Sequence, residues 1–149
     1  MRVLGTEFNL KHNALEIYVS GCSRNPHCEG CHNPESWNFN NGDLFSSFKP
    51  KLKNKITRYK DNIEKFWILG GEPLDNPDLI KLVRFLKSFN KGLWLFTSYK
   101  LQKTRNISRY FDYIKIGRYI KDLKTEDNIQ YGVKLATSNQ NIYKKGKDY

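Results

Sequence analysis

Short apolar runs alternate with longer amphipathic segments along this chain. The clearest runs are residues 15–21, 66–69, 93–97 and 112–117. Runs that are apolar on both faces are typical of buried parallel strands, which are joined by crossover connections. We therefore expect four strands here and a further extended segment at 129–135. A short strand and a turn at His12-Asn13 are expected within residues 1–14.

The segments between the runs have the spacing of helices. Residues 49–62 predict an amphipathic helix, with Pro50 tolerated in its first turn. A second helix is expected after Asn76 as the capping residue, with Pro77 at the first helical position. Residues 101–110 predict a weaker helix.

Strands alternating with helices predict an α/β fold with a mainly parallel sheet covered by crossover helices. A complete eight-stranded barrel takes about 250 residues, whereas this chain has 149. We expect an incomplete TIM-type barrel or a small open sheet, formed by one domain over residues 1–149, with 144–149 as a loose basic tail. Sites in such folds form at the carboxyl ends of strands. Residues 22–31, 70–73 and 97–99 each follow a predicted strand, so they should meet at one rim.

The charge balance has several possible meanings. The chain has 26 basic and 15 acidic residues, a formal charge of +11, which suits nucleic acid, an acidic protein or anionic small molecules. Many of the cations lie in the helix predicted at 49–62, where the spacing favours a solvated face over a nucleic-acid surface. No apolar run approaches the ~20 residues that span a bilayer. Clustered cysteines without an export signal indicate the reducing cytosol.

The only three cysteines, Cys22, Cys28 and Cys31, lie within ten consecutive residues. Three thiols leave one unpaired if disulfides form, and they do not complete a four-ligand structural zinc site. An iron–sulfur cluster held by three thiolates, with one iron open to a substrate, fits better. Zinc remains an alternative, with its fourth ligand drawn from His12, His27 or His32.

A second motif, Gly70-Gly71-Glu72-Pro73, follows the predicted strand at 66–69. Two glycines allow a ligand to approach the main chain closely, and the carboxylate of Glu72 can accept a hydrogen bond from an ammonium group. Pro73 restricts the backbone of Glu72. The alternative is a plain turn with Glu72 in solvent. Beside an open cluster, the motif suggests a ligand with an amino acid end.

Together these motifs resemble the radical S-adenosylmethionine (SAM) activases of glycyl radical enzymes, most closely the activators of anaerobic ribonucleotide reductase. The resemblance extends over most of the chain. Its segments are residues 19–22, 30–34, 36–37, 69–74, 94–100 and 117–120, with Ser138-Asn139-Gln140 near the end.

The resemblance implies a [4Fe-4S] cluster on Cys22, Cys28 and Cys31, with SAM on the fourth iron. Gly70, Gly71 and Glu72 would lie along the methionine part of SAM, Gly30 and His32 would supply backbone contacts, and Thr97 and Tyr99 are weaker candidates. The resemblance also implies that the 5′-deoxyadenosyl radical removes hydrogen from a glycine of the partner, the reductase large subunit. Cluster and SAM would carry this chemistry in place of a side-chain nucleophile. With no cysteine left for a second cluster, electrons would come from an external donor such as flavodoxin.

The chain departs from the family pattern at two places. It has Cys-x5-Cys-x2-Cys where the family has Cys-x3-Cys-x2-Cys, and it has Ile116 where better-studied activators carry an acidic residue. Two alternatives stay open. One is an activase of another glycyl radical enzyme, such as pyruvate formate-lyase. The other is a zinc-binding, basic nucleic-acid-binding module.

Overall fold

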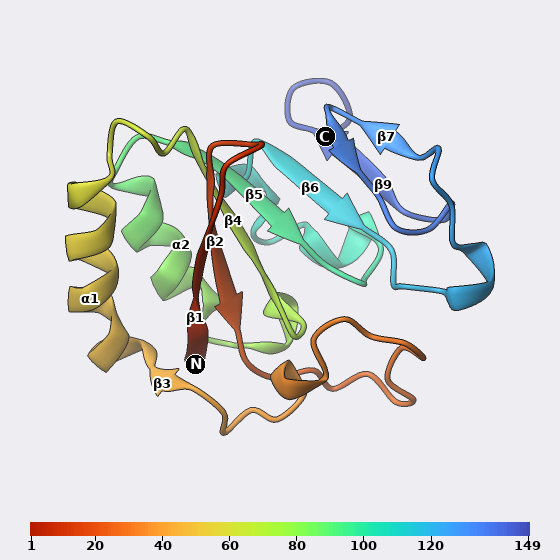
Figure 1. The fold of residues 1–149 in the computed structure, drawn as a ribbon, viewed down its shortest axis with the longest axis horizontal. Coiled ribbons are helices and arrows are strands. Elements are labelled where there is room, and N and C mark those ends of the chain that lie inside the picture. Colours follow the sequence, from red (N-terminus) through yellow and green to blue (C-terminus); the bar gives the residue numbers. More distant parts are fainter.

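The computed structural model describes residues 1–149 and contains a seven-stranded mixed sheet with two α-helices (Figure 1). The strands of this sheet are β1 (Arg2–Asn9), β2 (Ala14–Val19), β3 (Asp43–Leu44), β4 (Lys65–Gly70), β5 (Gly92–Phe96), β6 (Tyr113–Ile116) and β9 (Asn141–Lys144). β7 (Ile129–Gln130) and β8 (Val133–Lys134) form a separate two-stranded sheet. The helices are α1 (Phe45–Arg58) and α2 (Leu79–Lys87). No helix is both long and apolar enough to cross a bilayer.

The strand order in the sheet is β3-β1-β2-β4-β5-β6-β9. The four central strands β2, β4, β5 and β6 run parallel. At the two sides the pairings are antiparallel, between β1 and β2, β3 and β1, and β9 and β6. The carboxyl ends of the central strands therefore lie along one edge. The sheet is open, so the incomplete TIM-type barrel stays a prediction.

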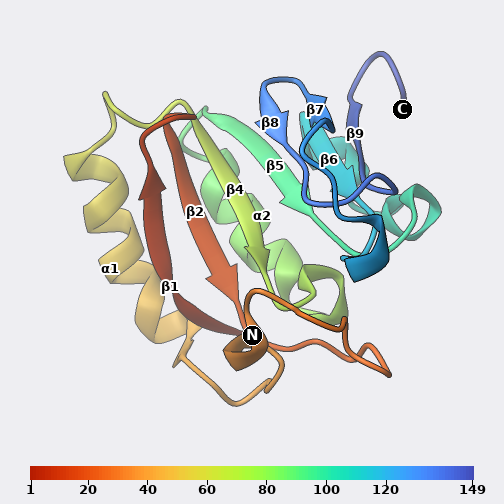
Figure 2. The same cartoon turned by 45° about the vertical axis from the view of Figure 1, so that its right-hand side comes forward.

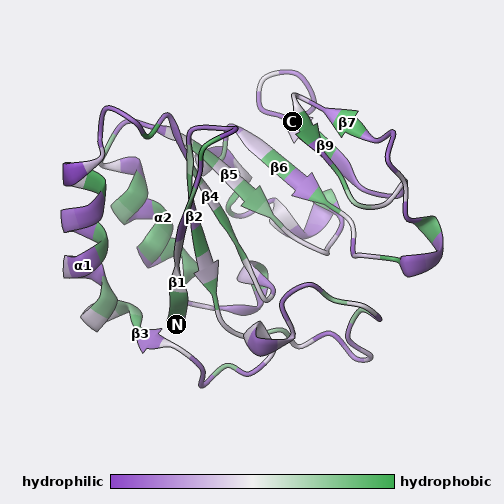
Figure 3. Ribbon diagram, in the orientation of Figure 1, coloured by the Kyte–Doolittle hydropathy of each residue, from purple (hydrophilic) through white to green (hydrophobic).

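Alternation along the central strands gives the sheet two different faces. On β4, Phe66 and Ile68 join the core beneath α1 and α2, whereas Trp67 packs on the opposite face with Trp94. Figure 2 shows the helices behind the sheet and the β7–β8 hairpin in front of it. The hydrophobic sides of both helices turn toward the sheet (Figure 3), and the lysines of α1 are exposed. Helices thus cover one face, and the other is left for a site.

Two of the three predicted helices start at other residues than the pattern indicated, and the third is not an α-helix. α1 begins at Phe45, four residues before the predicted start at 49, and Pro50 therefore lies inside the helix. The reason is tertiary: the main-chain N–H of Phe45 donates to the carbonyl of Met1, and β3 pairs with β1 just before it. Residues 101–110 form two 3₁₀ turns, Leu101–Thr104 and Ser108–Tyr110, and no α-helix.

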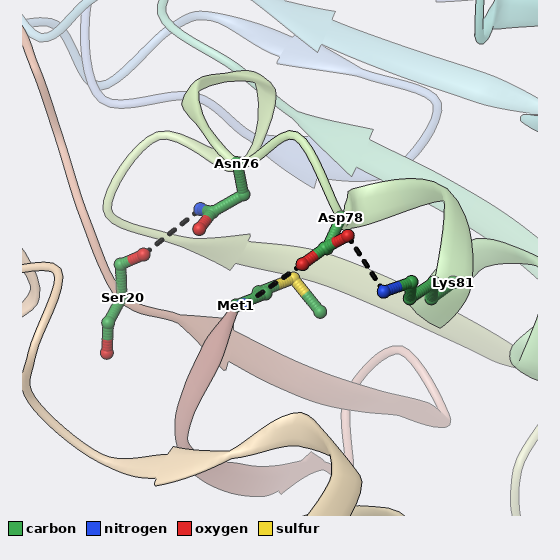
Figure 4. Close-up of polar contacts among 5 residues, drawn as sticks. All are labelled: Met1, Ser20, Asn76, Asp78 and Lys81. Carbon is green, nitrogen blue, oxygen red and sulfur yellow. Dashed lines mark hydrogen bonds and ion pairs between the residues drawn. The ribbon is translucent and has the colours of Figure 1, made fainter.

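The predicted cap of α2 was wrong. The helix follows Asp78, whose carboxylate lies 3.7 Å from the Met1 ammonium and 3.0 Å from Lys81 Nζ. Asn76 instead turns away from the helix, and its Nδ2 donates a 3.0 Å hydrogen bond to the buried carbonyl of Ser20 at the end of β2 (Figure 4). A side chain that local sequence assigns to a cap thus joins the end of β2 to the segment that leads into α2.

Two carboxyl-terminal segments are also more ordered than predicted. The extended segment at 129–135 is a hairpin whose turn residues, Tyr131 and Gly132, have φ values of 49° and 77°, as tight hairpin turns require. The prediction of a loose tail at residues 144–149 was wrong. Lys144 belongs to β9, and the hydroxyl of Tyr149 donates a 2.8 Å hydrogen bond to the carbonyl of Phe111.

Candidate functional site

The cysteine loop begins where β2 ends and is closed at its base by main-chain hydrogen bonds. The N–H of Gly21 donates to the carbonyl of Ser36 at 2.7 Å, and that of Cys22 donates to Trp37 at 3.1 Å. The imidazole of His27 stacks on the indole of Trp37 at 4.1 Å and lies 3.0 Å from the carbonyl of Cys22. His27 belongs to the lengthened Cys22–Cys28 spacing, so the extra residues pack against the base of the loop.

A polar cluster attaches the start of this loop to the ends of β4 and β5. Asp75 accepts hydrogen bonds from the N–H and hydroxyl of Ser23, at 2.7 and 2.8 Å, and from the hydroxyl of Tyr99 at 2.7 Å. The bond to Asp75, together with burial, raises the pKa of Tyr99. The guanidinium of Arg24 lies 4.1 Å over the Tyr99 ring and donates to Ser98. Tyr99, predicted as a cofactor contact, is therefore engaged in holding the loop.

The two glycines of the second motif are required by the backbone around them. A Cβ on Gly71 would lie 2.3 Å from the carbonyl oxygen of Gly21 and 2.7 Å from that of Ser36. Gly70 has φ +121°, and a Cβ there would lie 2.4 Å from the carbonyl oxygen of Val19. In this structure the missing side chains make room for the backbone of β2 and of the cysteine loop, which contact the glycine turn closely.

Glu72 is buried, with 1% of its surface exposed, so the alternative that placed it in solvent was wrong. Its Oε1 accepts from the N–H of Leu74 and the hydroxyl of Thr97, and its Oε2 accepts from the N–H and hydroxyl of Ser98. A carboxylate has about four lone-pair positions, and these four donors use them. Glu72 therefore joins the ends of β4 and β5.

An open groove of about 410 Å³ crosses the sheet face that the helices leave free. At the carboxyl end of the strands it is lined by Cys28, Cys31, His32, Gly70, Gly71, Thr97, Ser98, Lys115, Gly117, Arg118, Tyr119 and Gln140. Toward the other end it is lined by residues that include Asn9, Lys11, His12 and Trp67. Two cysteines and both glycines of the second motif thus face one cavity, whereas Cys22, Glu72 and Tyr99 do not line it.

The loop after β6 lies beside the cysteine loop. Arg118 donates a 3.0 Å hydrogen bond to the carbonyl of Pro26, and the Tyr119 ring meets the His32 ring edge-on at 5.2 Å. A Cβ on Gly30 would lie 3.4 Å from the same Tyr119 ring. Gly30 and His32, both predicted contacts, therefore lie where the two loops touch.

Comparison with known proteins agrees with this picture. Residues 13–143 match the family described as 4Fe-4S single cluster domain. The anaerobic ribonucleoside-triphosphate reductase-activating protein of Enterobacteria phage T4 is 33% identical over an alignment of 118 residues, and the match covers 74% of this chain and 73% of the phage protein. The chain belongs to this 4Fe-4S activating-protein family. The preference for iron–sulfur over zinc is confirmed at the level of the family.

The donors available to a cluster in this 4Fe-4S domain are the three cysteine thiols. All three are free and partly buried, and thiolates are the usual ligands of iron–sulfur clusters. No set of three or more His, Cys, Asp or Glu side chains is gathered closely enough to hold a metal ion. The fit to a cluster therefore depends on the chemistry of the donors and their position on one loop.

Sequence reasoning missed several residues of this 4Fe-4S domain. Lys115 interrupts an apolar strand and lines the groove, and this interruption was the one available signal. Asn139 Nδ2 donates to the carbonyl of Arg118, and Gln140 Nε2 donates to that of Gly117. The Ser-Asn-Gln element thus supports the loop after β6, which only tertiary structure reveals.

Proposed function

We propose that this 4Fe-4S domain activates an anaerobic ribonucleotide reductase by reductive cleavage of SAM, which generates a glycyl radical on the large subunit of the reductase. The phage relative is named as an activating protein of that reductase. The observation that carries the proposal is the groove, in which Cys28 and Cys31 face the same space as Gly70 and Gly71. Its volume of about 410 Å³ is in the range of small-molecule sites, ~300–1,000 Å³.

In this proposal Cys22, Cys28 and Cys31 hold the cluster. When bound, the cluster supplies the electron that cleaves the sulfonium of SAM. Gly70 and Gly71 line the groove, so the methionine part of SAM would lie along their main chain. The base of the loop, closed at Ser36 and Trp37, keeps the cysteines beside this surface.

Glu72 has a double role in the proposal. Its four acceptor positions are filled before a ligand arrives, so an ammonium group has to replace one donor. The hydroxyls of Thr97 and Ser98 are the replaceable donors, because a hydroxyl can rotate to another acceptor. Glu72 itself does not line the groove, whereas Thr97 and Ser98 do, so the amine of SAM would reach Glu72 past these two residues. Glu72 would then bind the amine while still joining the strand ends.

Electrons would come from an external carrier such as a flavodoxin, since the chain has no cysteine left for a second cluster. The experiment is anaerobic reconstitution with iron and sulfide, followed by incubation with SAM and dithionite and quantification of 5′-deoxyadenosine. We expect the nucleoside from the native chain and none from Cys31→Ala. Equal yields from both, or no nucleoside from a native chain that holds about four irons per molecule, as a [4Fe-4S] cluster requires, would contradict the proposal.

A further inference from the structure

Lys115 is a cation inside the groove with no carboxylate partner. On β6 the side chains of Ile114 and Ile116 pack into the core under the helices, and the strand alternation turns Lys115 to the opposite face, where it lines the groove. Its Nζ donates a 2.9 Å hydrogen bond to the carbonyl of Gly117. Lys115 forms none of the ion pairs in the structure. An ammonium has three N–H donors, so two of them remain for the groove.

The charges that would favour the protonated form of Lys115 are those of the Glu72 carboxylate and of a Cys28 thiolate. Glu72 already accepts four hydrogen bonds from other donors, and no Asp or Glu lines the groove. Ile116, the residue next along the strand, is apolar. Glu72 therefore offsets part of the Lys115 charge. Lys115 and Cys28 line the same groove, and no ion pair holds the ammonium elsewhere.

We propose that the Lys115 ammonium is a counter-charge of the thiolate-bound cluster and favours its one-electron reduction. This inference rests on one part of the proposed function, namely that the cluster is bound by the cysteine loop. Reduction transfers one electron from the reductant to the cluster, with no bond broken, and makes the cluster more negative by one charge. A fixed cation in surroundings of low dielectric stabilises that added charge, and nearby charge and hydrogen bonding are known to set cluster potentials.

Lys134 is a matched control within the same groove. It also lines the cavity, but its side chain is 50% exposed and pairs with Glu126. Solvent and its partner screen this charge. Replacing Lys134 by a neutral residue should therefore leave the reduction potential of the cluster unchanged, although it removes one positive charge just as replacing Lys115 does.

The experiment is a redox titration of the cluster-loaded chain without SAM, followed by EPR of the reduced cluster. In Lys115→Met and Lys115→Gln we expect the equilibrium constant for reduction to fall about tenfold, which is a decrease of about 59 mV in midpoint potential for one electron. Lys115→Arg and Lys134→Met should keep the native potential. A native potential in both neutral Lys115 variants, or an equal decrease in Lys134→Met, would overturn the proposal.

Loss of the cluster is also informative. If the neutral variants fail to retain iron while Lys115→Arg retains it, the need for a charge beside the cluster is supported. If Lys115→Arg loses iron as well, the residue has a packing role and the proposal is overturned. Because SAM is absent from the titration, an unchanged potential argues against Lys115 alone, whereas missing 5′-deoxyadenosine argues against the proposed function.

Discussion

The main-chain N–H of Glu72 donates a 2.7 Å hydrogen bond to the carbonyl of Gly21, the residue before the first cysteine. The strands that precede these residues, β2 and β4, are parallel neighbours, with Val19 opposite Gly70. The glycine turn and the base of the cysteine loop are therefore one hydrogen-bonded unit. A substitution in the glycine turn should therefore also disturb the conformation of the cysteine loop.

Gly71→Ala should destabilise the chain by about 3 kcal/mol, a cost typical of overpacking. The new methyl group would meet two main-chain oxygens, at 2.3 and 2.7 Å, and backbone cannot move aside as a flexible side chain can. Denaturant unfolding measures the loss, and iron retention should fall with it. Gly5→Ala is the control, because nothing lies within 4 Å of a Cβ at Gly5. Equal stability of both variants would refute the close approach.

Glu72→Gln should lower the free energy of unfolding by about 2 kcal/mol, because an amide has one acceptor oxygen and leaves buried donors unsatisfied. The donors that could lose their acceptor are the N–H of Leu74 and the N–H and hydroxyl of Ser98. Thr97→Val removes one donor to Glu72 and the acceptor of the partly buried N–H of Tyr99, and it should lower the free energy of unfolding by about 1 kcal/mol. Urea unfolding distinguishes the two. A Glu72→Gln variant no less stable than Thr97→Val would argue against a fully occupied carboxylate.

Tyr99→Phe should loosen the cysteine loop without unfolding the chain. It removes the 2.7 Å hydrogen bond to Asp75, worth about 1 kcal/mol, while Ser23 still bonds the other oxygen. We expect iron to be lost faster to a chelator from the variant than from the native chain. Tyr131→Phe is the control, since Tyr131 is 42% exposed. If the native chain, Tyr99→Phe and Tyr131→Phe lost iron to the chelator at the same rate, Tyr99 would not stabilise the cysteine loop.

Lys115 should make the stability of the cluster-free chain depend on pH. Burial lowers its pKa to about 8, with Glu72 and Cys28 opposing the shift, whereas the unfolded chain keeps a lysine pKa near ~10.4. Between these values the unfolded state binds more protons, so stability should rise with pH from about 8 to 10. Lys115→Met should lack this rise and be more stable at pH 7, by as much as about 3 kcal/mol. Parallel pH profiles of the two proteins would contradict the lowered pKa of Lys115.

Local sequence predicted the central strands well because their residues are apolar on both faces. It placed the helix boundaries less well, since Phe45 and Asn76 are positioned by Met1 and Ser20, which are distant in sequence. The cysteines and glycines were visible as motifs. The network around Glu72 was not, because it depends on which strand end lies beside which. Tyr149 looked like part of a tail because its partner, Phe111, is 38 residues away.

The most direct test of the account uses the anaerobic reductase itself. The reconstituted chain is incubated with the reductase large subunit, SAM and dithionite, and the frozen mixture is examined by EPR. We predict the signal of a glycyl radical on the reductase, dependent on SAM and absent with Cys22→Ala, Cys28→Ala or Cys31→Ala. A reductase that gains no radical from a chain with a full cluster, or gains it equally from the cysteine variants, would contradict the account.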